Sequence, residues 1–580
     1  MIMRSHIALI ILTIWAASAS AAQQLQTLLQ QEMEAGAISR GEFLAYQLIA
    51  AEDPDRLPLR YKTAGRDPLH CSSLITAEVR ALLPTLAGEE RSLLEQLLAR
   101  PTSGRLPLSV TSPAGHFRIH YAESGSDSAA ADFIAEAGRS FDYVYDLLVH
   151  TMGFTPPPSD DGIDGPELDI YVMRFSAYGE TRYENPVEGS DGQRYTSYIV
   201  IDNRFSGAGY ETKGIDALHV TAAHEFFHML QGAYRFFPST RMDSRFLFEA
   251  SSTWLEDVAY SEVNDYFQYV RSLFASPNRP FHLFSNITYG LGLYMTMLHK
   301  SHGYALIRRM WEELRDQEPL DALDRALRSY GNDLGRSLAT FTIWNAFTAD
   351  YADSLLYYPD SPSFPEITPV EKLTLSGERT ILNSCSQLES HYYTLSVAAG
   401  GSYTITPVLD PSAQWLYTLV IHEAGYESRH FTIAGETPLT FGPVSMECEL
   451  RLAVVNIQWP SAGSSQKKAA YTFRFAPSAH QTEHEDGVVM ISPSPFRPEQ
   501  DERLQIQFYS HEAVSEAALH ILSERGEVVY SRIMRSLPRG LNCQFWDGRD
   551  SSGRPLPSGI YLCAISGIGQ FKPHKMALVR

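Results

Sequence analysis

The chain has 580 residues, of which 44% are apolar and 20% are charged, as in an ordinary globular protein. This length is too great for a single hydrophobic core, so we expect several domains. The net charge of −21 disfavours nucleic acid and anionic membrane surfaces as partners.

Residues 1–22 have the pattern of a secretory signal peptide. Arg4 supplies a positive charge, an apolar run of 11 residues follows from Ile7 to Ala17, and small residues from Ala19 to Ala22 offer a cleavage site. The run is too short to cross a bilayer, so an uncleaved anchor is the less favoured alternative. No later segment has the length and apolarity of a membrane span. We expect the protein to be secreted, either extracellular or on the cell surface.

Residues 23–108 are predicted to form a helical region. Helical patterns cover 25–33, 40–51 and 77–98. This region contains Cys71, for which a lone thiol is the favoured interpretation.

A second domain is predicted over residues 109–358. Strands are expected at 117–121, 168–172 and 198–202, with a helix over 129–152 and a polar loop before the third strand. Helices are expected to fill its C-terminal part. Within it, Asp160–Gly165 is expected to form an Asp/Gly turn, and the alternative is a Ca²⁺ site.

The segment His224-Glu225-Phe226-Phe227-His228 carries the strongest chemical signal. It lies in a predicted helix over 214–232, so both imidazoles leave the same face one turn apart, as two ligands of a Zn²⁺ ion would. Glu225 stands beside that face, where it can take a proton from a metal-activated water. No cysteine lies near the motif in sequence, which favours a catalytic over a structural zinc.

A catalytic zinc needs a third protein ligand and an open position. Glu249, which lies 21 residues after His228 in a second predicted helix, is the favoured third ligand. Glu256, two turns further on, is the rival. Ser252, Glu256 and Asp257 are candidates for orienting a ligand histidine.

This arrangement resembles the gluzincin metallopeptidases, whose pattern is H-E-x-x-H followed about twenty residues later by a glutamate. The resemblance covers about forty residues. It implies His224, His228 and Glu249 as zinc ligands and Glu225 as general base and acid. The sequence departs from the thermolysin pattern at Thr253, where that group has an aspartate. The wider phrase is similar to large secreted bacterial metalloproteases.

The interpretation as a protease gives roles to further residues. Residues 23–108 would then be a pro-region of a zymogen, and a cap on the zinc by Cys71 is the less favoured alternative to a lone thiol. Tyr289 is the expected donor to the oxyanion that develops during amide hydrolysis, with Tyr260 as a second candidate.

After residue 365 the chain changes to short alternating runs typical of β-sandwiches. We expect one such domain over 365–478, a linker over 479–486 and a second over 487–580. The phrases Ser492–Pro498, Phe545–Asp550 and Ser558–Tyr561 resemble FlgD-like immunoglobulin-type domains. That resemblance implies a sorting role in type IX secretion or, alternatively, a passive module. Disulfides Cys385–Cys448 and Cys543–Cys563 are candidates, with free buried thiols as the alternative.

The predicted fold class is multidomain α+β: a helical pro-region, a zincin-like catalytic domain and two all-β sandwich domains. The predicted function is a secreted endopeptidase with one catalytic Zn²⁺, acting on protein or peptide substrates. Its other expected partner is secretion machinery, reached through the C-terminal domain. The alternatives are a surface adhesin with an inactive zincin lobe and a zinc hydrolase of non-peptide amides or esters.

Overall fold

The structure is a computed structural model. It describes residues 21–62, 69–190, 192–207, 210–236, 245–285, 287–460, 467–478, 487–492, 494–498, 503–569 and 572–580. Most of the predicted signal peptide and the whole predicted linker 479–486 lie outside these residues. Within them, no helix is long and apolar enough to cross a membrane.

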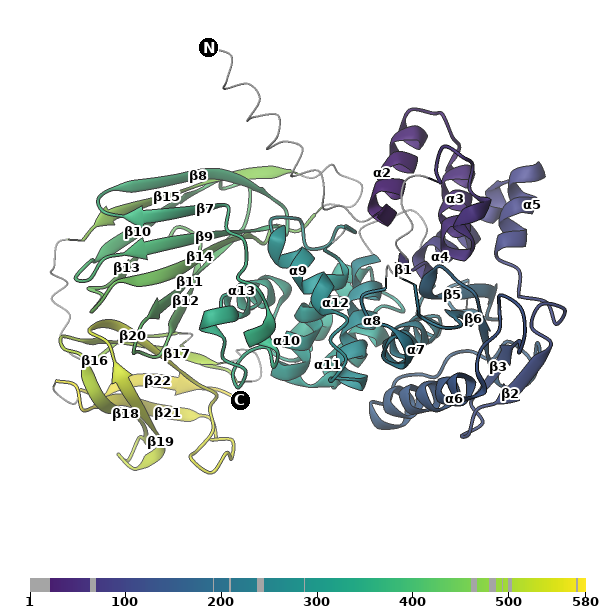
Figure 1. Cartoon of the computed structure of the whole chain (residues 1–580). Coiled ribbons are helices and arrows are strands. Elements are labelled where there is room, and N and C mark those ends of the chain that lie inside the picture. Colours follow the sequence, from purple (N-terminus) through teal and green to yellow (C-terminus); the bar gives the residue numbers. More distant parts are fainter. Residues whose placement is uncertain are drawn as a thin grey trace, which may run out of the picture. The chain divides into compact units, whose positions relative to one another are not determined.

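Two compact units make up the chain (Figure 1). Unit 1 comprises Met1–Gln268 and Leu314–Asp316, and unit 2 comprises Tyr269–Glu313 and Gln317–Arg580. The division falls inside the domain predicted over 109–358. The N-terminal region and the His224–His228 motif therefore belong to the same compact unit.

Four helices form the N-terminal region around a leucine-rich core that includes Leu29, Leu44 and Leu94. They are α2 (Ala21–Glu34), α3 (Arg40–Glu52), α4 (Ser73–Leu82) and α5 (Gly88–Leu97), with short 3₁₀ turns η1 (Pro54–Arg56) and η2 (Leu83–Thr85). The single helix predicted over 77–98 is wrong. The chain breaks at η2, where Pro84 cannot donate a backbone hydrogen bond.

The central element of unit 1 is a mixed sheet of six strands in the order β1-β5-β6-β4-β3-β2. Its strands are β1 (Leu69–Cys71), β2 (Leu108–Thr111), β3 (Phe117–Tyr121), β4 (Leu168–Met173), β5 (Ala177–Pro186) and β6 (Tyr195–Asp202). β5 runs antiparallel to β6, and β1 runs parallel to β5 at the edge of the sheet. The N-terminal region therefore contributes a strand to the main sheet.

The prediction of a polar loop between β4 and β6 is wrong, because this stretch contains β5. The alternation of apolar and polar residues did not reveal this strand, because polar residues occupy its buried positions. Glu180 and Arg182 form a buried ion pair on one face of the strand. Thr181 and Tyr183 point to the other face, toward α7, as the two-residue period of a strand requires.

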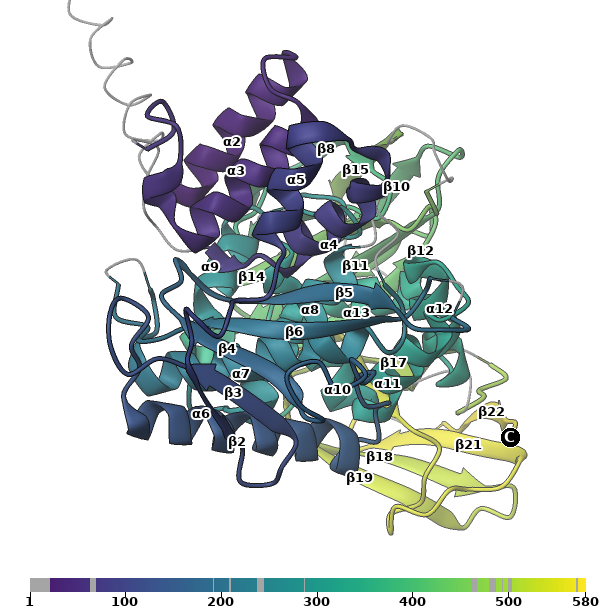
Figure 2. The same ribbon diagram turned by 90° about the vertical axis from the view of Figure 1, so that its right-hand side faces the viewer.

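Two helices cover that second face (Figure 2). They are α6 (Ala131–Tyr145), which continues into a π-helical turn, η3 (Asp146–Thr151), and α7 (Gly214–Gln231). α8 (Arg245–Ala259) packs against α7. Almost every side chain of α7 from Ala217 onward is buried, including both histidines and Glu225. The motif helix is therefore an interior helix of unit 1.

Unit 2 begins with helices and ends with four sheets. Its helices are α9 (Phe267–Ala275), η5 (Tyr289–Leu291), α10 (Gly292–His302), α11 (Tyr304–Glu313), α12 (Pro319–Ser329), α13 (Leu334–Trp344), η6 (Ala349–Tyr351) and η7 (Ser361–Ser363). Helices therefore fill the C-terminal part of the domain predicted over 109–358, as expected from the sequence.

Two sheets enclose one core over the predicted first sandwich. Their strand orders are β13-β10-β15-β8 and β12-β11-β14-β9-β7. The strands are β7 (Glu371–Leu375), β8 (Arg379–Ser386), β9 (Ser390–Val397), β10 (Tyr403–Leu409), β11 (Trp415–Glu423), β12 (Arg429–Ala434), β13 (Leu439–Phe441), β14 (Cys448–Asn456) and β15 (Lys468–Pro477).

The C-terminal region has a separate core between sheets β16-β17-β20 and β19-β18-β21-β22. Its strands are β16 (Gly487–Ser492), β17 (Leu504–Ser510), β18 (Val514–Ser523), β19 (Val528–Leu537), β20 (Gly540–Trp546), β21 (Gly559–Ser566) and β22 (His574–Leu578). The predicted multidomain class, with helices and several sheets, is confirmed.

All five cysteines are free and buried, so neither candidate disulfide is formed. Cys385 and Cys448 lie on different sheets of the first sandwich. Cys543 belongs to the core of that sandwich, whereas Cys563 belongs to the C-terminal core. The alternative expectation, free buried thiols, describes the structure.

Candidate metal centre

The two histidines of the motif face one another from adjacent turns of α7. Their Nε2 atoms are 3.1 Å apart, and both side chains are fully buried. The separation is close to the edge of a tetrahedral zinc site, which is about 3.3 Å for two nitrogen ligands. The helix therefore holds two imidazole nitrogens at the spacing that a single ion requires.

The opposite nitrogen of each ring is fixed by a hydrogen-bond acceptor. His228 Nδ1 donates to Gln231 Oε1 at 2.8 Å, and the Gln231 amide nitrogen donates to Phe248 O at 3.1 Å, which fixes the orientation of the amide. His224 Nδ1 lies 2.6 Å from Glu256 Oε1. With Nδ1 protonated in both rings, both Nε2 atoms are left as lone-pair donors toward the same point.

Glu249 completes the group from α8. Its Oε2 lies 3.2 Å from His224 Nε2 and 3.6 Å from His228 Nε2. Neither of its oxygens receives a hydrogen bond from any residue that the structure describes, although the residue is wholly buried. Glu256, the rival third ligand, contacts the outer nitrogen of His224 instead, so the geometry separates the roles of the two glutamates.

The electrostatics of the group call for a cation. Burial raises the pKa of Glu249, but His228 and His224 outweigh that effect and bring the pKa to about 2. Burial lowers the pKa of His228, and the charge of Glu249 reverses this and sets it above its ordinary value. Burial raises the pKa of Glu256 to about 8. An ionised carboxylate in the interior is thus held by positive charge at Nε2, which a proton or a metal ion can supply.

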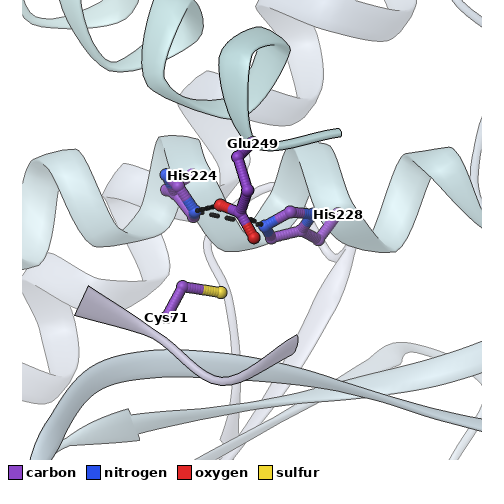
Figure 3. Close-up of side chains that lie close together, drawn as sticks. All are labelled: Cys71, His224, His228 and Glu249. Atoms are coloured by element: carbon purple, nitrogen blue, oxygen red, sulfur yellow. Dashed lines mark hydrogen bonds and ion pairs between the residues drawn. The ribbon is translucent and has the colours of Figure 1, made fainter. Parts of the chain in front are cut away.

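Cys71 lies with these three residues, although it is far from them in sequence. One ligand atom from each of Cys71, His224, His228 and Glu249 falls within 4.8 Å of all the others. Figure 3 shows the thiol facing the histidine pair from β1, on the side opposite Glu249. Burial, Glu225 and Glu249 raise the pKa of this thiol well above its ordinary value. No cysteine is close to the motif in the sequence, but Cys71 is close to it in the folded chain.

Glu225, the predicted general base, is held by two hydroxyl groups. Ser73 Oγ donates to Glu225 Oε2 at 2.8 Å, and Thr181 Oγ1 lies 2.9 Å from the same oxygen. The carboxylate is buried between α7, β5 and the start of α4. It does not take part in the group of four ligand atoms.

These residues fit a zinc ion. Two neutral imidazoles, a carboxylate and a thiol form a donor set that Zn²⁺ accepts with tetrahedral geometry. Each histidine has an outer hydrogen-bond partner, which is the usual support for a metal-bound imidazole. The buried Glu249 oxygens without hydrogen-bond donors are the atoms that an ion would satisfy.

The other predicted site residues are not members of the group of four ligand residues. Tyr289 belongs to unit 2, where its ring lies 5.0 Å from that of Tyr269. Tyr260 stacks on His219 at 4.4 Å. In the candidate Ca²⁺ loop, Asp160 accepts from Arg100 at 2.6 Å and from Gly162 N at 3.1 Å, as in an Asp/Gly turn. An arginine therefore already satisfies the first carboxylate of that loop.

Three residues of the site were not predicted from the sequence: Gln231, Ser73 and Thr181. Gln231 had a signal, because it lies three residues after His228 and so shares its helix face. Ser73 and Thr181 had none, since they reach Glu225 from separate segments that only the sheet brings together.

Two family models match parts of the chain. Residues 496–569 match the FlgD Ig-like domain, which confirms the predicted C-terminal domain. Residues 127–373 match a family of unknown function, DUF6055. The second match includes the two histidines and Glu249 but begins after Cys71. No curated protein matches the chain.

Among solved structures, PorZ of Porphyromonas gingivalis, a surface component of the type-IX secretion system, is 20% identical, with a TM-score of 0.14. The match covers 19% of this chain and only 14% of PorZ. The lysozyme inhibitor PliG of Aeromonas hydrophila is 11% identical over 19% of this chain and 100% of its own, with a TM-score of 0.14. The adhesin domain of Epf from Streptococcus pyogenes is 9% identical, with a TM-score of 0.12. That match covers 34% of this chain and 77% of the other chain. Scores this low define no common fold.

Proposed function

We propose that this protein is a secreted, zinc-dependent endopeptidase. His224, His228 and Glu249 hold the ion, and Glu225 acts as general base and then as general acid. The observation that carries the proposal is that the two Nε2 atoms and a buried carboxylate lie together, with an oxygen atom within hydrogen-bond distance of each Nδ1.

The chemistry follows from the position of Glu225. A zinc ion held by His224, His228 and Glu249 would polarise a substrate carbonyl and make a water molecule acidic. Glu225 lies one residue from His224, is buried, and is oriented by Thr181, so it can accept the proton of that water. The same carboxyl then protonates the leaving nitrogen. Tyr289 stays the proposed donor to the developing oxyanion.

Export rests on the two ends of the chain. Residues 1–22 have the composition of a signal peptide, and the C-terminal region is a FlgD Ig-like domain. We propose that this domain engages secretion machinery, of which the type IX route is the candidate. Deletion of residues 487–580 should then retain the protein inside an exporting host, while an intact chain reaches the medium.

The deciding experiment combines metal analysis with a proteolysis assay. Wild-type protein and the variant Glu225→Gln are purified, their zinc is measured, and casein digestion is followed before and after limited trypsin treatment, with and without chelator. The matched control is Glu188→Gln, an exposed acid of unit 1. We expect one zinc in all three proteins and chelator-sensitive digestion in the wild type and control alone. Full digestion by Glu225→Gln would refute the mechanism.

Two other functions are separated by the same assay. Zinc without digestion of any peptide, but with hydrolysis of small amides or esters, would indicate a hydrolase of non-peptide substrates. An adhesin with an inactive lobe would show neither activity. Glu225 and both histidines are buried on the same helix, and the presence of a base candidate beside two metal-ligand candidates supports hydrolysis over adhesion.

A further inference from the structure

We propose that residues 69–73 are a built-in inhibitor of the zinc site, with Cys71 as the fourth ligand. The inference rests on the proposed function and names its regulation. In this folded state the Cys71 thiol would occupy the fourth coordination position. Ser73 donates a hydrogen bond to Glu225, the proposed general base, and β1 pairs with the edge of β5 beside the site. The full chain is then a latent enzyme that becomes active when this segment leaves.

The first support is the geometry of the four ligand atoms. A catalytic zinc keeps one position open for water, and the sulfur of Cys71 is the fourth ligand-type atom within 4.8 Å of the other three (Figure 3). Glu249 approaches from α8 and Cys71 from β1, so the two flank the histidine pair. Cys71 is therefore part of a group of four whose single carboxylate, Glu249, has no hydrogen-bond donor in the described chain.

A second support comes from Ser73, two residues further on. Its hydroxyl donates to Glu225 Oε2 and accepts from Thr181 N at 2.6 Å. A base that already accepts a hydrogen bond from this serine is less available for the proton of water. The same short segment thus acts on both the proposed metal and the proposed base.

The third support is the occupied edge of β5. β1 pairs with it at Ala177 and Gly179. Where β1 ends, side chains of α4 take over: Thr76 Oγ1 donates to Thr181 O at 2.8 Å, and Arg80 Nε donates to Tyr183 O at 3.0 Å. An extended peptide substrate would need these same backbone groups to add a strand beside the site. The N-terminal region therefore occupies the surface where such a substrate would lie.

Contacts around Glu78 hold this arrangement in place without covalent bonds. Glu78 on α4 pairs with Arg245 on α8 at 3.1 Å and also with Arg40 on α3.

Ligation by Cys71 replaces its S–H bond with a metal–sulfur bond and releases one proton to solvent. On opening, the thiolate regains a proton and the ligand position becomes vacant. No oxidant or reductant is required.

The test of ligation uses the full chain with cobalt in place of zinc. A cysteine ligand gives a thiolate-to-cobalt charge-transfer band in the near ultraviolet, so we expect this band in the wild type and its loss in Cys71→Ser. The matched control is Cys448→Ser, another free buried cysteine, which should keep the band. A band that persists in Cys71→Ser, or a wild type that binds one cobalt without it, would overturn the inference and leave the proposed function standing.

Latency is tested with the double variant Cys71→Ala/Ser73→Ala. It should bind one zinc and digest casein at least about tenfold faster than the untreated full chain, which corresponds to loss of an inhibitory contact of about 1.4 kcal/mol. If the wild type shows the charge-transfer band but the double variant digests casein no faster, the metal site is a closed structural site and the proposed latency is overturned. Absence of metal from the wild type would instead refute the proposed function itself.

Discussion

Cys71 lies directly opposite Gly179 in the parallel ladder between β1 and β5. Gly179 in turn lies against the motif helix. A Cβ atom on this residue would come within 2.8 Å of Glu225 Cγ and 2.9 Å of Thr221 Cγ2. β5 can approach α7 this closely because residue 179 has no side chain. Gly179 is thus a neighbour of Cys71 within the sheet and of Glu225 across the face of the sheet.

Replacement of Gly179 by alanine should therefore push Glu225 out of place while leaving the histidines. We expect casein digestion by the trypsin-treated protein to fall by about 100-fold, the usual effect of a displacement of about 1 Å at a catalytic group. Zinc content should stay at one. The control is Gly377→Ala, where a Cβ meets nothing within 4 Å. Undiminished digestion by Gly179→Ala would show that Glu225 is not the base.

The hydrogen bond from His224 to Glu256 predicts a graded effect on metal affinity. Glu256→Gln keeps the size of the side chain but replaces the carboxyl group that holds His224 Nδ1 by an amide, so we expect zinc affinity to fall by about 10- to 100-fold. Competition with a chromophoric chelator measures the change. Glu262→Gln, an exposed neighbour beyond the helix, should bind zinc as the wild type does. Equal affinities for all three proteins would argue against zinc binding at His224.

Tyr289 has a separate prediction, since it was assigned from the sequence. If its hydroxyl stabilises the oxyanion, Tyr289→Phe should lower kcat by about 10²- to 10³-fold with KM and zinc content little changed. Tyr330→Phe serves as the control for loss of a hydroxyl in the same unit. Retention of kcat by Tyr289→Phe would remove the tyrosine from the mechanism.

Unit 2 should lose stability in acid through His422. This side chain is buried on β11, with Nε2 donating to Ala346 O at 3.1 Å, and burial together with Arg451 lowers its pKa to about 3. The unfolded chain takes up a proton below its ordinary pKa of 6.5, whereas the native state does not until about pH 3. The contribution of neutral, buried His422 to the free energy of unfolding is thus complete above pH 6.5. It is lost progressively as the pH falls from 6.5 toward about 3.

Urea denaturation of wild type and His422→Gln at pH 7, 6 and 5 measures this effect. We expect the free energy of unfolding of the wild type to fall more steeply below pH 6.5, by up to about 1.4 kcal/mol per pH unit relative to the variant. Glutamine keeps a donor for Ala346 O, so the two proteins should differ mainly in slope. Parallel slopes would mean that His422 is protonated in the native state.

Much of the fold was predictable because its signals are local. The helix over 214–232 and the strands at 117–121, 168–172 and 198–202 follow from apolar periodicity, and their positions agree with α7, β3, β4 and β6. β5 was missed because its interior positions carry Glu180 and Arg182. Their pairing neutralises the cost of burying charge, and a sequence pattern does not reveal a pairing partner.

The candidate site divides in the same way. The shared helix face of His224 and His228, with Glu225 beside it, followed from the sequence alone, since helical geometry relates residues four apart whatever surrounds them. The separate roles of the two glutamates depend on the packing of α8 against α7, which brings Glu249 to the Nε2 atoms and Glu256 to the outer nitrogen of His224. The tertiary fold alone placed Cys71 and Ser73 against the motif, because the pairing of β1 with β5 joins segments more than a hundred residues apart. Strand pairing between distant segments depends on the whole sheet, and no local pattern encodes it.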